Sequence, residues 1–249
     1  MGGAPTMRER FEAARQSGRP LLGGHRGNPA ELPENTLASF RSALELGVDL
    51  VECDVHLSSD GRLVVIHDHT VDRTTNGRGP VRDLTGAELG ALDAGGGERV
   101  PFLEEVLDLA AGRVHVAVEL KQAPLPYPGL EEALVGLLRE AEMVGQCAVI
   151  SFSHPSAKLV KELEPGLLTG ILDVGRPVDP LAMMKAARAD IFASHWTGCD
   201  PAMAGAIHGA GHSVALWVVD DPVSAAWTRA CGPDCVFTNR PREIARLLS

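Results

Sequence analysis

The sequence predicts an α/β fold, a (β/α)8 barrel of the TIM type, and three observations support this prediction. The chain has 249 residues, a length that α/β barrels commonly reach in one domain. Short apolar runs alternate with amphipathic segments along the whole chain, a pattern typical of a parallel sheet with helical crossovers. No G-x-G-x-x-G sequence follows the first run, which disfavours a doubly wound sheet. We therefore expect one domain over residues 1–249.

Nine apolar runs are candidate strands, one more than such a barrel needs. They cover residues 20–25, 48–55, 63–67, 114–120, 147–152, 167–172, 190–194, 213–218 and 234–238. Only a short segment around residues 58–61 separates the second run from the third, too little for a helical crossover. The third run is therefore predicted to form a local hairpin with the second, or a bent extension of it.

Amphipathic helices are predicted between the strands. They cover residues 36–46, 103–110, 130–143, 155–162, 180–187, 201–208, 222–230 and 241–248. Several begin with Pro, which suits the first turn of a helix. Asp179, Asp200 and Asp221 each precede such a Pro, and we expect them to cap the helices that follow.

Residues 69–100 interrupt the alternation of strands and helices. This stretch is rich in Gly, Asp, Thr and Arg, with only a weak helical pattern at residues 87–92. Long loops are uncommon without a function and often lie over a binding site. We predict a small inserted subdomain here, at the end of a strand.

Charge and cysteine content exclude several classes of protein. The formal charge is −10, from 23 Lys and Arg against 33 Asp and Glu, which argues against a nucleic-acid binder. Five scattered Cys indicate reduced thiols and no zinc site. The first twenty residues contain no apolar run, and no helix has a basic amphipathic face. We therefore expect a cytoplasmic protein without stable membrane insertion.

Three carboxylates are predicted at the mouth of the barrel. Because side chains alternate along a strand, Glu52 and Asp54 share one face, which points inward, and Glu119 lies inward at the end of the next barrel strand. Such an all-oxygen set favours one divalent ion, Mg²⁺ or Ca²⁺. The alternative is that each carboxylate pairs with its own cation, Glu119 with Lys121 in particular.

Two histidines, His25 and His67, end strands beside these carboxylates. Arg26 follows the first and can grip two phosphate oxygens, while Lys121 can supply a point charge to a phosphate. Asn35 lies at the start of a helix, where it is either a cap or a substrate contact. One His removing a proton and the other protonating an alkoxide would suit cleavage of a phosphodiester, with metal, Arg and Lys neutralising charge on the phosphoryl oxygens.

The chain resembles the glycerophosphodiester phosphodiesterase family through ordered motifs. These are His25-Arg26-Gly27, Pro33-Glu34-Asn35-Thr36, Glu52-Cys53-Asp54-Val55, Val65-Ile66-His67-Asp68, Asp72-Arg73-Thr74-Thr75-Asn76-Gly77, Pro101-Phe102-Leu103-Glu104-Glu105, Glu119-Leu120-Lys121, Ser151-Phe152, Trp217 and Thr238-Asn239.

The resemblance implies a barrel with an inserted subdomain and the hydrolysis of glycerophosphodiesters to glycerol 3-phosphate and an alcohol. It implies a metal ion on the residues Glu52, Asp54 and Glu119, acid–base catalysis by His25 and His67, and phosphate contacts from Arg26 and Lys121. We add Asn35 and Trp217 as expected substrate contacts. The partner is then a small diester, and we favour a soluble one.

Three other functions stay open at this point. A phospholipase-C-like enzyme would stop at a cyclic phosphate, and a lysophospholipid phosphodiesterase would use the same barrel. A binding protein without catalysis is disfavoured, because every polar residue that the chemistry needs is present. Asn239 stands where the family typically has Asp, which leaves its role open. His195 and Trp196 either contact the alcohol or form a capped loop with a packed ring.

Overall fold

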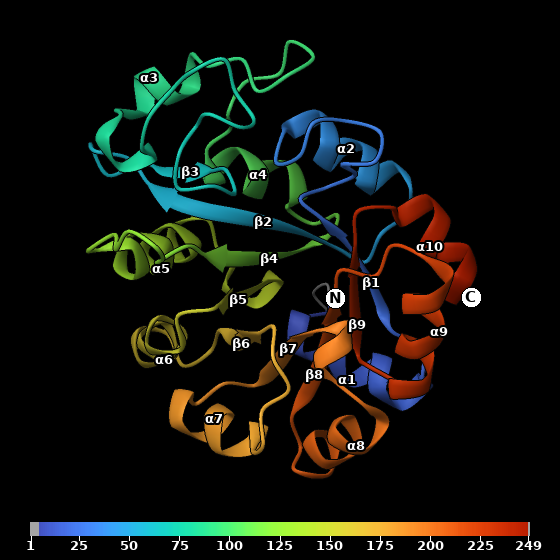
Figure 1. The fold of residues 1–249 in the computed structure, drawn as a ribbon. Coiled ribbons are helices and arrows are strands. Elements are labelled where there is room, and N and C mark those ends of the chain that lie inside the picture. The colour runs from blue at the N-terminus through green and yellow to red at the C-terminus, as the bar shows by residue number, and fades with distance from the viewer. Residues whose placement is uncertain (1–4, 249) are drawn as a thin grey trace.

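The computed structural model describes residues 5–248, so residues 1–4 and 249 of the predicted domain lie outside it (Figure 1). Within the described chain, eight parallel strands form a closed barrel, in which β1 pairs with both β2 and β9. These are β1 (Leu21–His25), β2 (Leu50–Leu57), β4 (His115–Leu120), β5 (Cys147–Ser151), β6 (Leu168–Asp173), β7 (Ile191–His195), β8 (Ser213–Trp217) and β9 (Cys235–Thr238). The predicted barrel is confirmed.

The short strand β3 (Leu63–Val65) does not belong to the parallel barrel. It pairs antiparallel with the end of β2, where Val55 faces Val65. The predicted hairpin between the second and third apolar runs is therefore confirmed, and it carries the chain from the barrel into the insertion.

Helices surround the barrel, as Figure 1 shows. They are α2 (Leu37–Glu45), α4 (Leu103–Ala110), α5 (Leu130–Glu140), α6 (His154–Leu163), α7 (Pro180–Ala187), α8 (Pro201–Gly209), α9 (Pro222–Cys231) and α10 (Pro241–Leu248), with 3-10 turns η2 (Val144–Gln146) and η3 (Trp196–Gly198). The side chains of Asp179, Asp200 and Asp221 accept from backbone N–H groups in the first turns of α7, α8 and α9. All three predicted caps are confirmed.

The barrel strands turn one face to the helices and the other to the interior. On β2, Val51, Cys53 and Val55 are buried among the apolar residues of the surrounding helices. Burying each such side chain contributes roughly 1.5–3 kcal/mol. The alternate residues of β2 must then point into the barrel, which places its polar side chains inside.

Helix α1 (Met7–Ser17) is not among the predicted elements, and it closes the N-terminal end of the barrel. Its buried residues Met7, Phe11 and Ala14 pack with the first residues of the strands, such as Leu21 and Leu50. The spacing of these three residues places them on one helix face. The opposite end, where the strands finish, is left to the polar residues.

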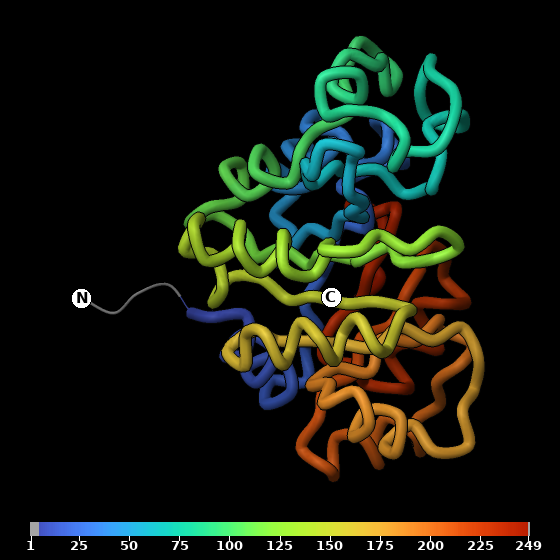
Figure 2. The backbone as a smooth tube through the Cα atoms, turned by 90° about the vertical axis from the view of Figure 1, so that its left-hand side faces the viewer, coloured from blue at the N-terminus to red at the C-terminus, as the bar shows by residue number. Residues whose placement is uncertain are grey.

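The insertion has its own small apolar cluster. It contains η1 (Val81–Asp83) and α3 (Gly86–Gly90), the latter at the predicted weak helix. The cluster consists of Val64, Ile66, Val71, Val81, Leu89, Ala94 and Val100. Figures 1 and 2 show the insertion as a separate lobe next to β3 at one edge of the molecule. Between residues 5 and 248, no helix has both the length and the apolar content needed to cross a membrane.

Candidate active site

Three buried carboxylates meet inside the barrel. The register of β2 on β4 sets Asp54 beside Glu119, and Glu52 lies two residues earlier on the same face of β2. One oxygen from each of these side chains lies within 4.8 Å of the others. Glu52 Oε1 is buried without a hydrogen-bond partner among the described residues. An all-oxygen donor set with an unpaired buried oxygen fits a hard divalent ion.

Two cations share this carboxylate cluster (Glu52, Asp54 and Glu119). Lys121 Nζ lies 2.9 Å from Asp54 Oδ1 and 2.5 Å from Glu119 Oε1. Arg26 Nε lies 3.1 Å from Asp54 Oδ2, and the Arg26 backbone N–H donates to Glu52 Oε2 at 3.0 Å. The alternative of simple pairing is therefore realised in part, with two cations for three carboxylates.

The pKa values of the three carboxyls reflect this imbalance. Burial opposes ionisation of Asp54, yet Lys121 and Arg26 hold its pKa well below the usual range. Burial raises the pKa of Glu119 to about 7, although Lys121 opposes the shift. Burial and the neighbouring Asp54 raise the pKa of Glu52 well above its usual value. The cluster as it stands lacks positive charge.

His25 lies at the end of β1 with a side chain that is 12% exposed. Its Nε2 is 3.9 Å from Glu52 Oε2, and its Nδ1 is 2.8 Å from Asn239 Oδ1. Burial, and then the charge of Arg26, lower the pKa of His25 to about 4. The imidazole is therefore neutral at neutral pH.

The end of strand β1 requires a glycine at position 24. A Cβ on Gly24 would lie 2.4 Å from the carbonyl oxygen of Gly27, so the turn after β1 can close only without a side chain there. This close turn directs His25 and Arg26 to the carboxylate cluster.

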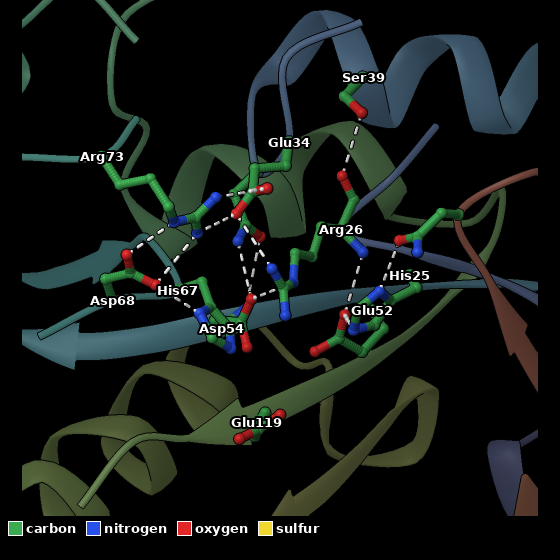
Figure 3. A network of polar contacts seen from close by, with 12 residues as sticks. His25, Arg26, Glu34, Ser39, Glu52, Asp54, His67, Asp68, Arg73 and Glu119 are labelled. Carbon is green, nitrogen blue, oxygen red and sulfur yellow. Dashed lines mark hydrogen bonds and ion pairs between the residues drawn. The ribbon is translucent and has the colours of Figure 1, made fainter. Parts of the chain in front are cut away.

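His67 follows β3 and is more exposed than His25, at 32%. Its Nδ1 is 2.7 Å from Asp68 Oδ1, and Asp68 Oδ2 in turn accepts from Arg73 Nε at 2.7 Å. Burial lowers the pKa of His67, while Asp54 and the hydrogen bond to Asp68 oppose the shift. Figure 3 shows His67 and His25 on either side of Asp54 and Glu52.

Three further side chains support the His67 side, and sequence reasoning assigned them no role. Glu34 accepts from Arg73 Nη2 at 2.7 Å and from Arg26 Nη1 at 3.0 Å, so it links the insertion to β1. His56 Nε2 donates to the backbone carbonyl of His67 at 3.1 Å. The signal for Glu34 and Arg73 was their place inside the quoted motifs.

Asn35 lies behind the carboxylate cluster. The cap of α2 is Thr36, whose hydroxyl accepts from the Ser39 N–H, so the interpretation of Asn35 as a cap is wrong. Asn35 is 3% exposed, and its Nδ2 donates to Asp54 Oδ2 at 2.8 Å. The structure therefore places it as a support of Asp54 and not on the pocket wall.

The remaining predicted residues line one pocket with the histidines. Its polar wall consists of His25, Arg26, Glu52, His67, Glu119 and Lys121, and its apolar wall of Ile150, Phe152, Leu172, Trp217, Val218 and Phe237. Trp217 packs edge-on against Phe152 and His195, each at 5.5 Å between ring centroids. His195 therefore reaches the apolar wall, while Trp196 packs against the outer core.

Comparisons with known proteins agree with this geometry. Residues 25–243 match the model of the glycerophosphoryl diester phosphodiesterase family. The chain is 37% identical over 238 residues to a glycerophosphodiester phosphodiesterase of Caldanaerobacter subterraneus subsp. tengcongensis, covering 92% of this chain and 97% of the relative.

Two solved structures are similar over almost their whole length. A glycerophosphodiester phosphodiesterase from Agrobacterium tumefaciens is 31% identical with a TM-score of 0.80, covering 91% of this chain and 99% of that one. An Oleispira antarctica phosphodiesterase in complex with the product sn-glycerol-3-phosphate is 29% identical with a TM-score of 0.83, covering 94% and 98%. The sequence, the barrel and the pocket together place this chain in the glycerophosphoryl diester phosphodiesterase family.

Proposed function

We propose that this protein hydrolyses glycerophosphodiesters to glycerol 3-phosphate and an alcohol, with one divalent ion and two histidines. The observation that carries the proposal is a single pocket lined by His25, His67, two cations and two members of the carboxylate cluster, with the third, Asp54, buried behind them. The names of the relatives support the substrate class, and so does the product bound in the Oleispira antarctica phosphodiesterase.

The charge of the pocket supports a divalent ion. With all three carboxyls ionised, as an ion would require, the cations Arg26 and Lys121 leave one negative charge, which would repel a phosphodiester anion. Glu52, Asp54 and Glu119 would hold Mg²⁺ or Ca²⁺, and the net charge would then become positive. Bound there, the ion would neutralise charge that develops on the phosphoryl oxygens. Arg26 and Lys121 would orient the same oxygens.

The two histidines supply the proton transfers. As the attacking oxygen bonds to phosphorus, one imidazole accepts its proton, and the P–O bond to the departing alcohol breaks. An alkoxide is a poor leaving group, so the second imidazole must donate a proton to it. The different surroundings of His25 and His67 suit these opposite tasks.

The apolar wall would hold the carbon skeleton of the substrate. Trp217 presents a ring face large enough to pack on a glycerol or alcohol group. Asn35 would act indirectly, because its amide holds Asp54 in place.

A product assay tests this proposal. Glycerophosphodiesters with choline, ethanolamine, inositol and glycerol as the alcohol are incubated with the protein, beside a lysophospholipid, with and without chelator. Free glycerol 3-phosphate that disappears with chelator and returns with Mg²⁺ or Ca²⁺ is the expected result. A stable cyclic phosphate would instead indicate the phospholipase-C-like reaction. Full activity in excess chelator would exclude a role for the ion.

A further inference from the structure

A chain of hydrogen bonds runs from Asp220 through Asn239 to His25. Asp220 follows β8 and Asn239 follows β9, so the pairing of these two strands brings the side chains together. Asn239 Nδ2 donates to Asp220 Oδ2 at 2.6 Å. His25 Nδ1 lies 2.8 Å from Asn239 Oδ1. These hydrogen bonds therefore connect the ends of the last two barrel strands, β8 and β9, to the end of the first strand, β1.

Asp220 is fixed by neutral donors. Its Oδ1 accepts from the backbone N–H of Asn239 and from the hydroxyl of Thr238, both at 2.8 Å. All the hydrogen bonds described for this carboxylate come from Thr238 and Asn239, which carry no charge. These hydrogen bonds all serve to hold the strand end and the Asn239 amide.

The direction of the hydrogen bonds determines which nitrogen of His25 carries hydrogen. An ionised carboxylate only accepts, so Asn239 must turn its NH₂ group to Asp220 and its carbonyl oxygen to His25. That oxygen also only accepts, so His25 Nδ1 must donate. A neutral imidazole has a single N–H, and Nε2 of His25 therefore carries no hydrogen and has a free lone pair.

This unprotonated Nε2 is the nitrogen that faces the carboxylate cluster. His25 Nε2 is 3.9 Å from Glu52 Oε2, on the side of the carboxylate cluster. We propose that Asp220, through Asn239, holds His25 in the Nδ1–H tautomer and so makes it the proton acceptor of the reaction. Asp220 and Asn239 are then positioning residues, since they act through His25.

The proton balance follows from this assignment. A proton passes from the attacking oxygen to the lone pair on His25 Nε2 while the new O–P bond forms. The bond from phosphorus to the departing alcohol breaks, and the alkoxide takes a proton from His67. His67 Nδ1 is engaged with Asp68 at 2.7 Å, so the proton leaves from its Nε2. Exchange with water returns both rings to their starting states.

The fall in kcat that follows loss of tautomer control is known from another enzyme. In the serine-protease triad, replacing the aspartate that sets the histidine tautomer lowers kcat by about 10⁴-fold while the geometry survives. Asp220 and Asn239 line the adjoining pocket that also borders His25 and Arg26, and not the pocket that holds Glu52, Glu119 and Lys121. The same kind of loss is therefore expected here, in kcat more than in KM.

The first measurement concerns the wild-type protein with Mg²⁺ present. Selective ¹⁵N labelling of histidine, with His25 assigned by comparison with H25Q, distinguishes Nδ1–H from Nε2–H in the neutral ring. The expected result is Nδ1–H. An Nε2–H ring in active wild-type protein would overturn this inference and leave the proposed activity standing, whereas an inactive wild-type protein would overturn the proposed activity on which the catalytic part rests.

The second measurement uses D220N, which keeps the shape of the side chain but lets the Asn239 amide turn over. We expect kcat to fall by at least about 10²-fold with KM within about threefold, the scale of general base catalysis, and the His25 ring to become a tautomer mixture. The double variant D220N/N239D restores a carboxylate acceptor next to Nδ1, and it should recover most of the lost kcat.

The matched control is D221N, the same substitution one residue later. Asp221 only caps α9, where it accepts from the N–H groups of Val223 and Ser224. D221N should keep wild-type kcat and the Nδ1–H tautomer. The inference is overturned if D220N retains kcat within about threefold, if the double variant recovers nothing, or if D221N loses as much as D220N.

Discussion

The two histidines of the pocket differ in their burial and in the group that contacts their Nδ1 atoms. On the barrel side, His25 is 12% exposed and its Nδ1 faces a neutral amide oxygen of Asn239. On the insertion side, His67 is 32% exposed and its Nδ1 faces the carboxylate of Asp68. A neutral amide oxygen favours an imidazolium less than a carboxylate does, because only the carboxylate carries a negative charge.

This difference shows how one barrel can place an acid and a base around one phosphate. In the proposed mechanism the proton acceptor, His25, would come from the closed barrel, where burial keeps the ring neutral. The proton donor, His67, would come from the chain just before the insertion, where the charged network of Asp68, Arg73 and Glu34 lies nearer to solvent. Two titratable groups whose surroundings push their pKa values apart are typical of acid–base pairs.

The largest expected effect comes from removing either histidine. H25A and H67A should each lower kcat/KM on glycerophosphodiesters by roughly 10²-fold or more. With a nitrophenyl phosphodiester, the departing phenolate needs no proton. H67A should therefore regain much of its activity on this substrate, and H25A should not.

Two outcomes would contradict the division between the sides. If both variants were rescued equally by the nitrophenyl substrate, the assignment of one acid and one base would be wrong. If both kept nearly normal activity on glycerophosphodiesters, neither ring would take part in proton transfer.

The next effect concerns Arg26, which joins the two sides by contacting Glu34 and Asp54. R26K keeps the charge but loses the planar fork. We expect kcat/KM to fall by about tenfold, since a hydrogen bond to a charged group contributes roughly 1.5–3 kcal/mol. The exposed pair of Arg139 and Glu164 offers a control, because R139K should leave kcat/KM unchanged. An unchanged value for R26K would remove Arg26 from the substrate site.

Most of the barrel side could be predicted from sequence, because it depends on local patterns. Polar residues at the ends of apolar runs, such as His25 and Glu52, indicate the mouth of the barrel, because alternation along a strand shows which side chains point inward. Asp220 could not be predicted this way, since only the register of β8 on β9 brings it to Asn239.

The missed helix and the insertion show a second limit. Helix α1 had a signal in the capping box of Thr6 and Glu9, but its role in closing the barrel depends on packing with residues of separate strands, such as Leu21 and Leu50. In the insertion, Arg73 meets Glu34 across 39 residues of chain, and spacing alone does not reveal such a pair.

A smaller effect tests the insertion side. The acid must be protonated, so kcat/KM falls as pH rises through the pKa of His67, and falls at low pH as His25 protonates near pH 4. Asp68 raises the pKa of His67, so D68N should move the basic limb of this bell to lower pH. A partly exposed ion pair contributes roughly 0.2–1 kcal/mol, so the limb should move by about half a pH unit. D72N, in the same insertion, should leave the limb in place, and an upward move in D68N would contradict the role of Asp68.

The smallest expected effect concerns the ion that lies between the two sides. The folded-state pKa of Glu119 is raised from 4.5 to about 7 by burial. An acid whose pKa is raised in the folded state stabilises the metal-free fold fully below its unfolded pKa, and this contribution disappears as pH rises through about 7.

Because the ion must displace the proton of Glu119, Mg²⁺ should bind more tightly at pH 8 than at pH 5. The rise in Tm on adding Mg²⁺ should therefore be larger at pH 8, by about 5 °C if binding there contributes roughly 2–3 kcal/mol. In E119Q one ligand is lost and only Glu52 still gives up a proton, so the rise should be small and should depend less on pH than in the wild-type protein. E140Q changes an exposed residue of α5 and should behave as wild type. Equal Tm increments at pH 5 and pH 8 in the wild-type protein would show that Glu119 gives up no proton to the ion, and would contradict this prediction.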